Sequence, residues 1–220
     1  MKNILARGGV EFLAVFLGIG LSFNVEEWRE ESQIRERLKA DYQSIQNDLE
    51  KEIPYLIQII EGQKESIEAG LKLIQMLDEE HSFDYKLFVE SKKLVTSGNT
   101  FFGTKASYEA SVSSGRLTYF GIDTLANEIG QVYEHHYDRL DLNGKLLDEV
   151  NFYKFPNFNS GVRYLTNKIK KQNLDIIHSS EYYPAMVEFI SLQNSYVLKA
   201  NLALYQMKKV NELLLKKLNE

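Results

Sequence analysis

The chain has 220 residues, a formal net charge of −5 and 44% hydrophobic residues. This composition excludes a wholly disordered or collagen-like chain, and the acidic balance argues against nucleic acid as a partner. Because the chain contains no cysteine, a disulfide scaffold, a cysteine nucleophile and a thiolate metal site are also excluded. A chain of this length is expected to form one domain with a sizeable core.

The first apolar stretch predicts a transmembrane anchor over residues 1–28. Residues 4–25 are about as long as the ~20 residues that cross a bilayer, and Glu11 is the one carboxylate among them. Trp28 follows at the position expected of an aromatic side chain at the membrane interface. A buried helix of a soluble protein and a signal peptide are the alternative interpretations.

One face of this segment predicts a helix-packing surface. Arg7, Glu11, Ala14, Gly18 and Ser22 are spaced 4, 3, 4 and 4 residues apart, so they share a narrow stripe of a helix. The three small residues in the stripe allow close approach of a second membrane helix. We expect the stripe to pack against a second copy or a partner protein. The alternative is a local Arg7–Glu11 pair beside small residues that are common in membrane helices.

From Glu26 onward the sequence predicts long amphipathic helices. Apolar residues recur at helical spacing along one stripe: Ile34, Leu38, Tyr42, Ile45, Leu49, Ile53, Leu56 and Ile60. Pro54 is expected to kink or restart this helix, with a second helical segment over 55–77. The last helix, from Met186 to Leu218, carries a heptad-like pattern with lysines near its end.

Shorter helices are predicted between these long ones. Residues 83–95 and 105–114 each show a helical pattern, and the second ends at Gly115. Residues 123–153 are mostly helical with an interruption expected at 143–144, whereas 152–161 predicts a loop. The fold class is therefore all-α: an N-terminal transmembrane helix that continues into a helical bundle over residues 29–220.

No pattern in the sequence predicts a catalytic, cofactor-binding or metal site, so we do not expect an enzyme. His81 and His178 each follow an aspartate by three residues, but both pairs lie near predicted helix ends. For the adjacent pair His135 and His136, we expect a surface histidine beside a half-buried one on an amphipathic helix.

Two regions resemble an uncharacterised bacterial family, a domain of unknown function with one N-terminal transmembrane helix. The first region is residues 10–31, which read VEFL, then GI, then NVEEWREE. The second is residues 108–117, YEASVSSGRL, followed by the aromatic residues of 133–137. The resemblance implies a membrane-anchored helical protein and implies no activity.

These observations predict a membrane-anchored interaction or assembly protein, either homo-oligomeric or an accessory subunit of a membrane complex. The expected partners are the lipid bilayer and a second copy or another membrane protein. The alternative is a membrane-tethered sensory or ligand-binding module. We expect a single pass through a bacterial inner membrane. A periplasmic C-terminal domain is favoured by the acidic cluster after the span, whereas the count of lysines and arginines favours a cytoplasmic one.

Overall fold

The computed structural model describes residues 2–78, 84–96, 98–151 and 174–220, and for residues 2–11, 13, 14 and 123 it describes the backbone alone. These parts of the chain are helical with short connections, which confirms the all-α prediction. The elements in chain order are α1 (Lys2–Asp78), α2 (Tyr85–Val95), α3 (Ala106–Ser113), η1 (Arg116–Phe120), α4 (Asp123–Gly130), η2 (Gln131–Tyr137), α5 (Asp138–Glu149) and α8 (Tyr182–Leu218).

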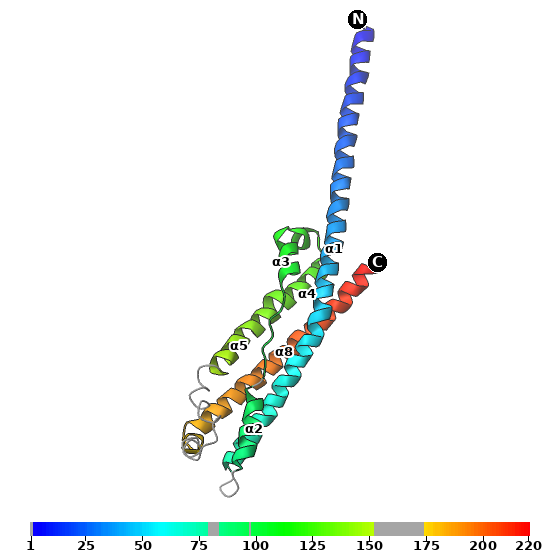
Figure 1. Cartoon of the computed structure of the whole chain (residues 1–220). Helices are drawn as coiled ribbons and strands as arrows, with labels where there is room; N and C mark the ends of the chain where they lie inside the picture. Colours follow the sequence, from blue (N-terminus) through cyan, green and yellow to red (C-terminus); the bar gives the residue numbers. More distant parts are fainter. Residues whose placement is uncertain (1, 79–83, 97, 152–173) are drawn as a thin grey trace.

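The bundle is organised around α1 and α8, which lie side by side and run antiparallel (Figure 1). The helix α2 packs on the part of α1 that is far from the N-terminus, and α3 packs nearer the middle of α1. The continuous run α4–η2–α5 packs on α8, and each of its three parts contacts that helix. The N-terminal part of α1 projects beyond the bundle without a neighbouring helix (Figure 1).

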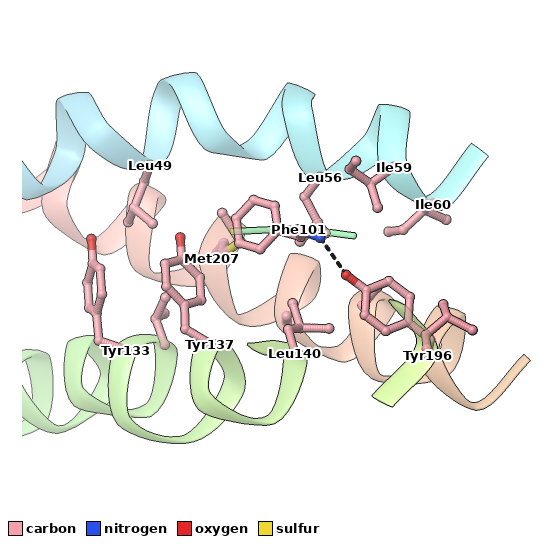
Figure 2. Packing of buried hydrophobic residues seen from close by; sticks show 14 of the residues in the cluster. Leu49, Leu56, Ile59, Ile60, Phe101, Tyr133, Tyr137, Leu140, Tyr196 and Met207 are labelled. Atoms are coloured by element: carbon pink, nitrogen blue, oxygen red, sulfur yellow. Dashed lines mark hydrogen bonds between the residues drawn. The ribbon is translucent and has the colours of Figure 1, made fainter. Parts of the chain in front are cut away.

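The predicted apolar stripes of both long helices form the core. In α1, the side chains of Ile45, Leu49 and Leu56 are fully buried, and Met207 and Leu214 are fully buried in α8. Figure 2 shows how these rows from α1 and α8 meet the aromatic side chains of η2. The spacing of apolar residues alone therefore identified the inward faces of both helices.

The prediction that Pro54 restarts the helix is wrong, because α1 continues through it to Asp78. A proline in a helix interior leaves the carbonyl four residues earlier without its donor. Pro54 lies on the exposed side of α1, where water can satisfy that carbonyl, while the buried stripe on the other side packs on α8. Tertiary packing thus outweighs the local cost of the proline.

The predicted interruption at 143–144 is also wrong. Residues 123–149 form a continuous helical run in which η2 is a wider, π-helical stretch. Gly144 faces inward, and a Cβ atom built on it would lie 3.2 Å from the Cβ of Thr100. This glycine therefore permits close packing rather than breaking the helix.

The other predicted boundaries agree with the structure within a few residues. The helix predicted over 83–95 begins at Tyr85, because the Asp84 side chain accepts hydrogen bonds from the backbone N–H groups of Lys86 and Leu87 at 2.9 and 3.1 Å. The last helix begins at Tyr182, earlier than predicted. The loop predicted over 152–161 lies outside the described residues.

The predicted transmembrane anchor lies within the first part of α1, which passes residue 28 without a break. In the part of the chain whose placement is described, no helix combines the length and the apolar character needed to cross a membrane. The predicted span is therefore not confirmed by the described residues.

Candidate functional site

The projecting part of α1 exposes an unusual amount of apolar surface. Nine large apolar side chains are exposed there, each by more than half: Phe12, Val15, Phe16, Leu17, Ile19, Leu21, Phe23, Val25 and Trp28. Consecutive positions on a helix differ by about 100° in direction, so these side chains surround the helix on every side. Burial of one such side chain contributes about 1.5–3 kcal/mol, which makes this segment the strongest candidate for an interaction site.

The residues predicted to form the helix-packing stripe are only partly described. The side chains of Arg7, Glu11 and Ala14 lie outside the described residues. Gly18 has no atom within 4 Å of a Cβ built on it, and the Ser22 hydroxyl donates to the Gly18 carbonyl at 2.8 Å. These two small residues lie in a shallow groove along the bare helix. Within the described residues, the part of the predicted stripe around Gly18 and Ser22 is therefore not covered by another helix.

A second group of polar side chains lies inside the bundle, around the non-helical segment 98–104. The backbone N–H of Phe101 donates to the Tyr196 hydroxyl at 2.7 Å (Figure 2). The backbone N–H of Thr104 donates to the Glu52 carboxylate. Because backbone groups outside secondary structure need other partners when buried, these side chains hold the segment against α1 and α8.

Buried amides extend this network towards α2. The Gln63 side chain is fully buried and donates to the Asn99 carbonyl at 2.8 Å. Its oxygen accepts a hydrogen bond from Gln193 at 3.3 Å, and Gln193 also donates to the hydroxyl of Ser66. The Ser66 hydroxyl donates in turn to the carbonyl of Val95, at the end of α2. The network joins α1, α2, α8 and the non-helical segment.

Aromatic rings form a row across the same region. Neighbouring ring centroids lie 4.6–5.7 Å apart along the row Tyr55, Phe101, Tyr137, Tyr133 and Tyr108. Tyr133 and Tyr137 come from η2, and Figure 2 shows both pointing towards α1. Stacked and edge-on contacts of this kind stabilise a core beyond the area that they bury.

Two of these tyrosine hydroxyls donate to carboxylates. Tyr137 donates to Glu52 in the core, and Tyr108 donates to Glu134 at the surface of η2. The Tyr133 hydroxyl is buried and has no hydrogen-bond partner in the described residues. Burial is the main cause that raises the pKa of all three phenols. They therefore stay protonated as donors or packing groups at neutral pH.

The segment 108–117 attaches α3 and η1 to α1. The Arg116 guanidinium donates to the Asp41 carboxylate through Nε at 2.6 Å and Nη2 at 3.0 Å, and the Ser111 hydroxyl donates to the same carboxylate at 2.8 Å. Gly115 lies between them with φ of 75°, a conformation that side chains disfavour. The SSGR sequence thus encodes a turn and an ion pair. The sequence offered no signal that Asp41 was its partner.

The two adjacent histidines lie on η2 as predicted, with His135 exposed and His136 half-buried. Their ring centroids are 5.0 Å apart, and burial is the main cause that lowers the pKa of His136. In the described ranges, no three His, Cys, Asp or Glu side chains gather as a metal site would require. His81 lies outside those ranges. Nothing in this geometry assigns the pair a chemical role.

Comparison with known proteins places the chain in a family. A model for a family of unknown function, DUF6090, matches residues 11–195. Since this match covers most of the chain, the protein belongs to that family. No curated protein and no solved structure is similar to the chain. The match overlaps both regions on which the resemblance rested, and the family carries no assigned activity.

Proposed function

We propose that this DUF6090 protein is a helical interaction protein that is held at a membrane by residues 4–25 and assembles through the same helix. The single observation that carries this proposal is the ring of exposed apolar side chains between Phe12 and Val25. A helix that is apolar on all sides is characteristically buried in protein or in lipid. The proposal includes no catalytic step.

Polar groups within the segment are consistent with an apolar environment. Besides the Ser22 bond, the Asn24 amide donates to the Gly20 carbonyl at 2.8 Å, within the same helix. Such bonds lower the cost of taking a polar side chain out of water. The charged segment begins directly afterwards, where Arg29 pairs with Glu26 at 2.7 Å. Trp28 lies at this boundary, as an interfacial aromatic would.

In the proposed arrangement, α1 crosses a bacterial inner membrane once and residues 29–220 lie on the periplasmic side. The crossing includes residues 4–11, whose side chains lie outside the described part of the chain. The cluster Glu26–Glu27 next to Trp28 supports this orientation. A cytoplasmic bundle is the alternative, because lysines and arginines are more numerous after the span.

The proposed assembly contact is the open side of α1 at Gly18 and Ser22. In lipid, helices associate by close packing, and small residues let two backbones approach. The groove beside Gly18 is lined by Val15, Ile19 and Phe23, which supply the contact surface around it. A second copy or another membrane helix would fill this groove.

Replacing Gly18 by isoleucine tests this contact. The matched control is Gly20→Ile, because Gly20 also has open space around its Cβ position but lies on a different side of the helix. We expect the native mass of the full chain, extracted in a mild detergent, to exceed one copy. That mass should fall in Gly18→Ile and stay unchanged in Gly20→Ile. An unchanged mass in Gly18→Ile would remove the groove as the contact.

The second candidate function is a membrane-tethered ligand-binding module. It is favoured by a polar hollow of about 860 Å³ between α3, η1, α4 and η2. Tyr108, Glu134 and His135 lie at this hollow, so its lining contains both hydrogen-bond donors and hydrogen-bond acceptors for a bound molecule. A full chain that stays monomeric in a mild detergent would favour this function over assembly.

A further inference from the structure

A second hollow lies at the end of the bundle where α1 leaves it and α8 ends. We call it the end hollow, and it has a volume of about 350 Å³. Its apolar lining comes from α1, from η1 and the residues after it, and from α8: Leu38, Tyr42, Phe120, Ile122 and Leu218. Leu38 and Tyr42 are buried at its floor, whereas Phe120 and Ile122 are about half exposed at its edge.

The floor of the end hollow is fixed by a contact between distant parts of the chain. The backbone N–H of Ile122 donates to the Tyr42 hydroxyl at 3.3 Å. This bond attaches the turn after η1 to Tyr42 on α1. The neighbouring α1 residue, Asp41, forms an ion pair with Arg116 and so holds the start of η1. The apolar surface is therefore formed before any ligand binds, which reduces the ordering cost of binding.

The charged lining of this apolar surface consists of three cationic side chains, Arg35, Lys39 and Lys217, and one carboxylate, Glu220. Arg35 pairs with Glu31 at 3.1 Å in a largely exposed pair, and the half-buried Lys217 pairs with the exposed Glu220 at 2.8 Å. No ion pair of Lys39 is found in the described part of the chain. Exposed ion pairs contribute little stability, so an incoming anion can replace Glu31 or Glu220 at small cost.

We propose that the end hollow binds the anion of a single-chain fatty acid. The acyl chain would lie on the Leu38, Tyr42 and Ile122 surface, and the carboxylate would lie among Lys39, Lys217 and Arg35. The apolar floor and cationic edge match the two parts of this ligand. The volume is near the lower end of the ~300–1,000 Å³ range of ligand pockets, which favours one acyl chain over the two chains of a phospholipid.

The proposal is tested by the saturable binding of radiolabelled dodecanoate to the full chain held in amphipol. An Ile122→Trp variant serves as the blank, because the exposed position allows a larger ring that fills the hollow. Uptake by the amphipol is the same in both samples, so their difference reports the hollow. We expect about one site per chain in the wild type and no saturable site in the variant.

The role of charge is tested by Lys39→Gln combined with Lys217→Gln. We expect this double variant to bind dodecanoate about tenfold more weakly, since two charge-assisted contacts are lost. Its matched control is Lys51→Gln combined with Lys64→Gln, two exposed lysines elsewhere on α1, which should bind normally. Dodecanol should bind to the wild type about as weakly as dodecanoate binds to the double variant. Circular dichroism checks that each variant is folded.

Three results would overturn the proposal. Equal binding of dodecanol and dodecanoate would show that no anion is selected. Equal binding by the wild type and Ile122→Trp would place the dodecanoate elsewhere. If Ile122→Trp lowers the native mass and no dodecanoate binds, the hollow is a contact between protein chains. The residues of the end hollow all lie in the bundle, so these results do not depend on whether residues 4–25 enter a membrane.

Discussion

Glu52 joins the non-helical segment to the bundle core. Its carboxylate accepts one hydrogen bond from the Thr104 backbone and one from the Tyr137 hydroxyl, and the side chain is buried. An unsatisfied buried donor costs roughly 1–3 kcal/mol. Truncation of this one side chain leaves the buried Tyr137 hydroxyl without an acceptor, whereas the N–H of the exposed residue Thr104 can turn to water.

We therefore expect Glu52→Ala to lower the free energy of unfolding by about 1–3 kcal/mol. The control is Glu50→Ala, an exposed position on the same helix, for which we expect a change within about 0.5 kcal/mol. Urea unfolding of the full chain, followed by circular dichroism, measures both. Equal stability of the two variants would show that Thr104 and Tyr137 find other acceptors.

Tyr196 makes stability depend on alkaline pH. Burial raises the pKa of its phenol to about 12, with the Phe101 N–H bond acting in the opposite direction. An unfolded tyrosine ionises near pH 10, so above that pH the unfolded chain releases a proton that the folded chain keeps. Stability should therefore fall as the pH rises from about 10 to about 12.

The check on this prediction is Tyr196→Phe, which removes the titrating group. Between about pH 9 and about pH 11, we expect the variant to lose less of its free energy of unfolding than the wild type loses. The comparison is between slopes with pH, because the variant also loses a hydrogen bond. Parallel slopes would contradict the assignment of the raised pKa to this phenol.

Close packing of α1 against α8 depends on one glycine. A Cβ atom built on Gly70 would lie 2.8 Å from the side chain of Ile190, whereas one built on Gly62 would meet nothing within 4 Å. Both glycines lie within α1. Replacing either by alanine gains the same helix propensity, about 0.5–1 kcal/mol. The two positions therefore separate propensity from interhelical packing.

We expect Gly62→Ala to stabilise the protein by about 0.5–1 kcal/mol and Gly70→Ala to gain less or to destabilise, because Ile190 must move. Thermal unfolding of the two variants side by side gives the difference. If Gly70→Ala stabilises as much as Gly62→Ala does, the two long helices are not in close contact at this point.

The sequence predicted the helices and their buried faces better than it predicted the breaks between helices and the contacts of the connecting segments. The spacing from Leu38 to Ile60 identified the buried face of α1, because burial and period coincide there. Pro54 and Gly144 misled the prediction, because packing decides their effect and packing is not visible locally. The contacts of segment 98–104 lay beyond prediction for the same reason, since Glu52 and Tyr196 are distant in sequence.

For the candidate site, the sequence identified the apolar segment but did not show whether other parts of the chain cover it. The apolar run around Gly18 was evident from composition, and the structure adds that the run is exposed on all sides. By contrast, the end hollow could not be predicted, because Lys39, Ile122 and Lys217 meet only after folding. A hollow between three elements has no local signal in one sequence.

At the scale of the whole molecule, the protein is a helical bundle with a bare apolar extension of one of its two long helices (Figure 1). The bundle buries an apolar core and also exposes separate apolar side chains such as Leu198 and Leu202, whereas the extension exposes nine large apolar side chains within 17 consecutive residues, 12–28. The central claim is that these side chains enter a lipid membrane. Lysine near the centre of a membrane helix costs roughly 2.5–3.5 kcal/mol, so lysine substitutions there test the claim.

The most direct measurement is flotation of the full chain with lipid vesicles through a density gradient. The test variant is Leu17→Lys combined with Leu21→Lys, and the control is Leu198→Lys combined with Leu202→Lys on α8, with the same residue type, spacing and degree of exposure. We predict that the wild type and the α8 variant float with the vesicles and that the Leu17/Leu21 variant stays at the bottom. A wild-type chain that stays at the bottom, or three chains that float alike, would contradict the account.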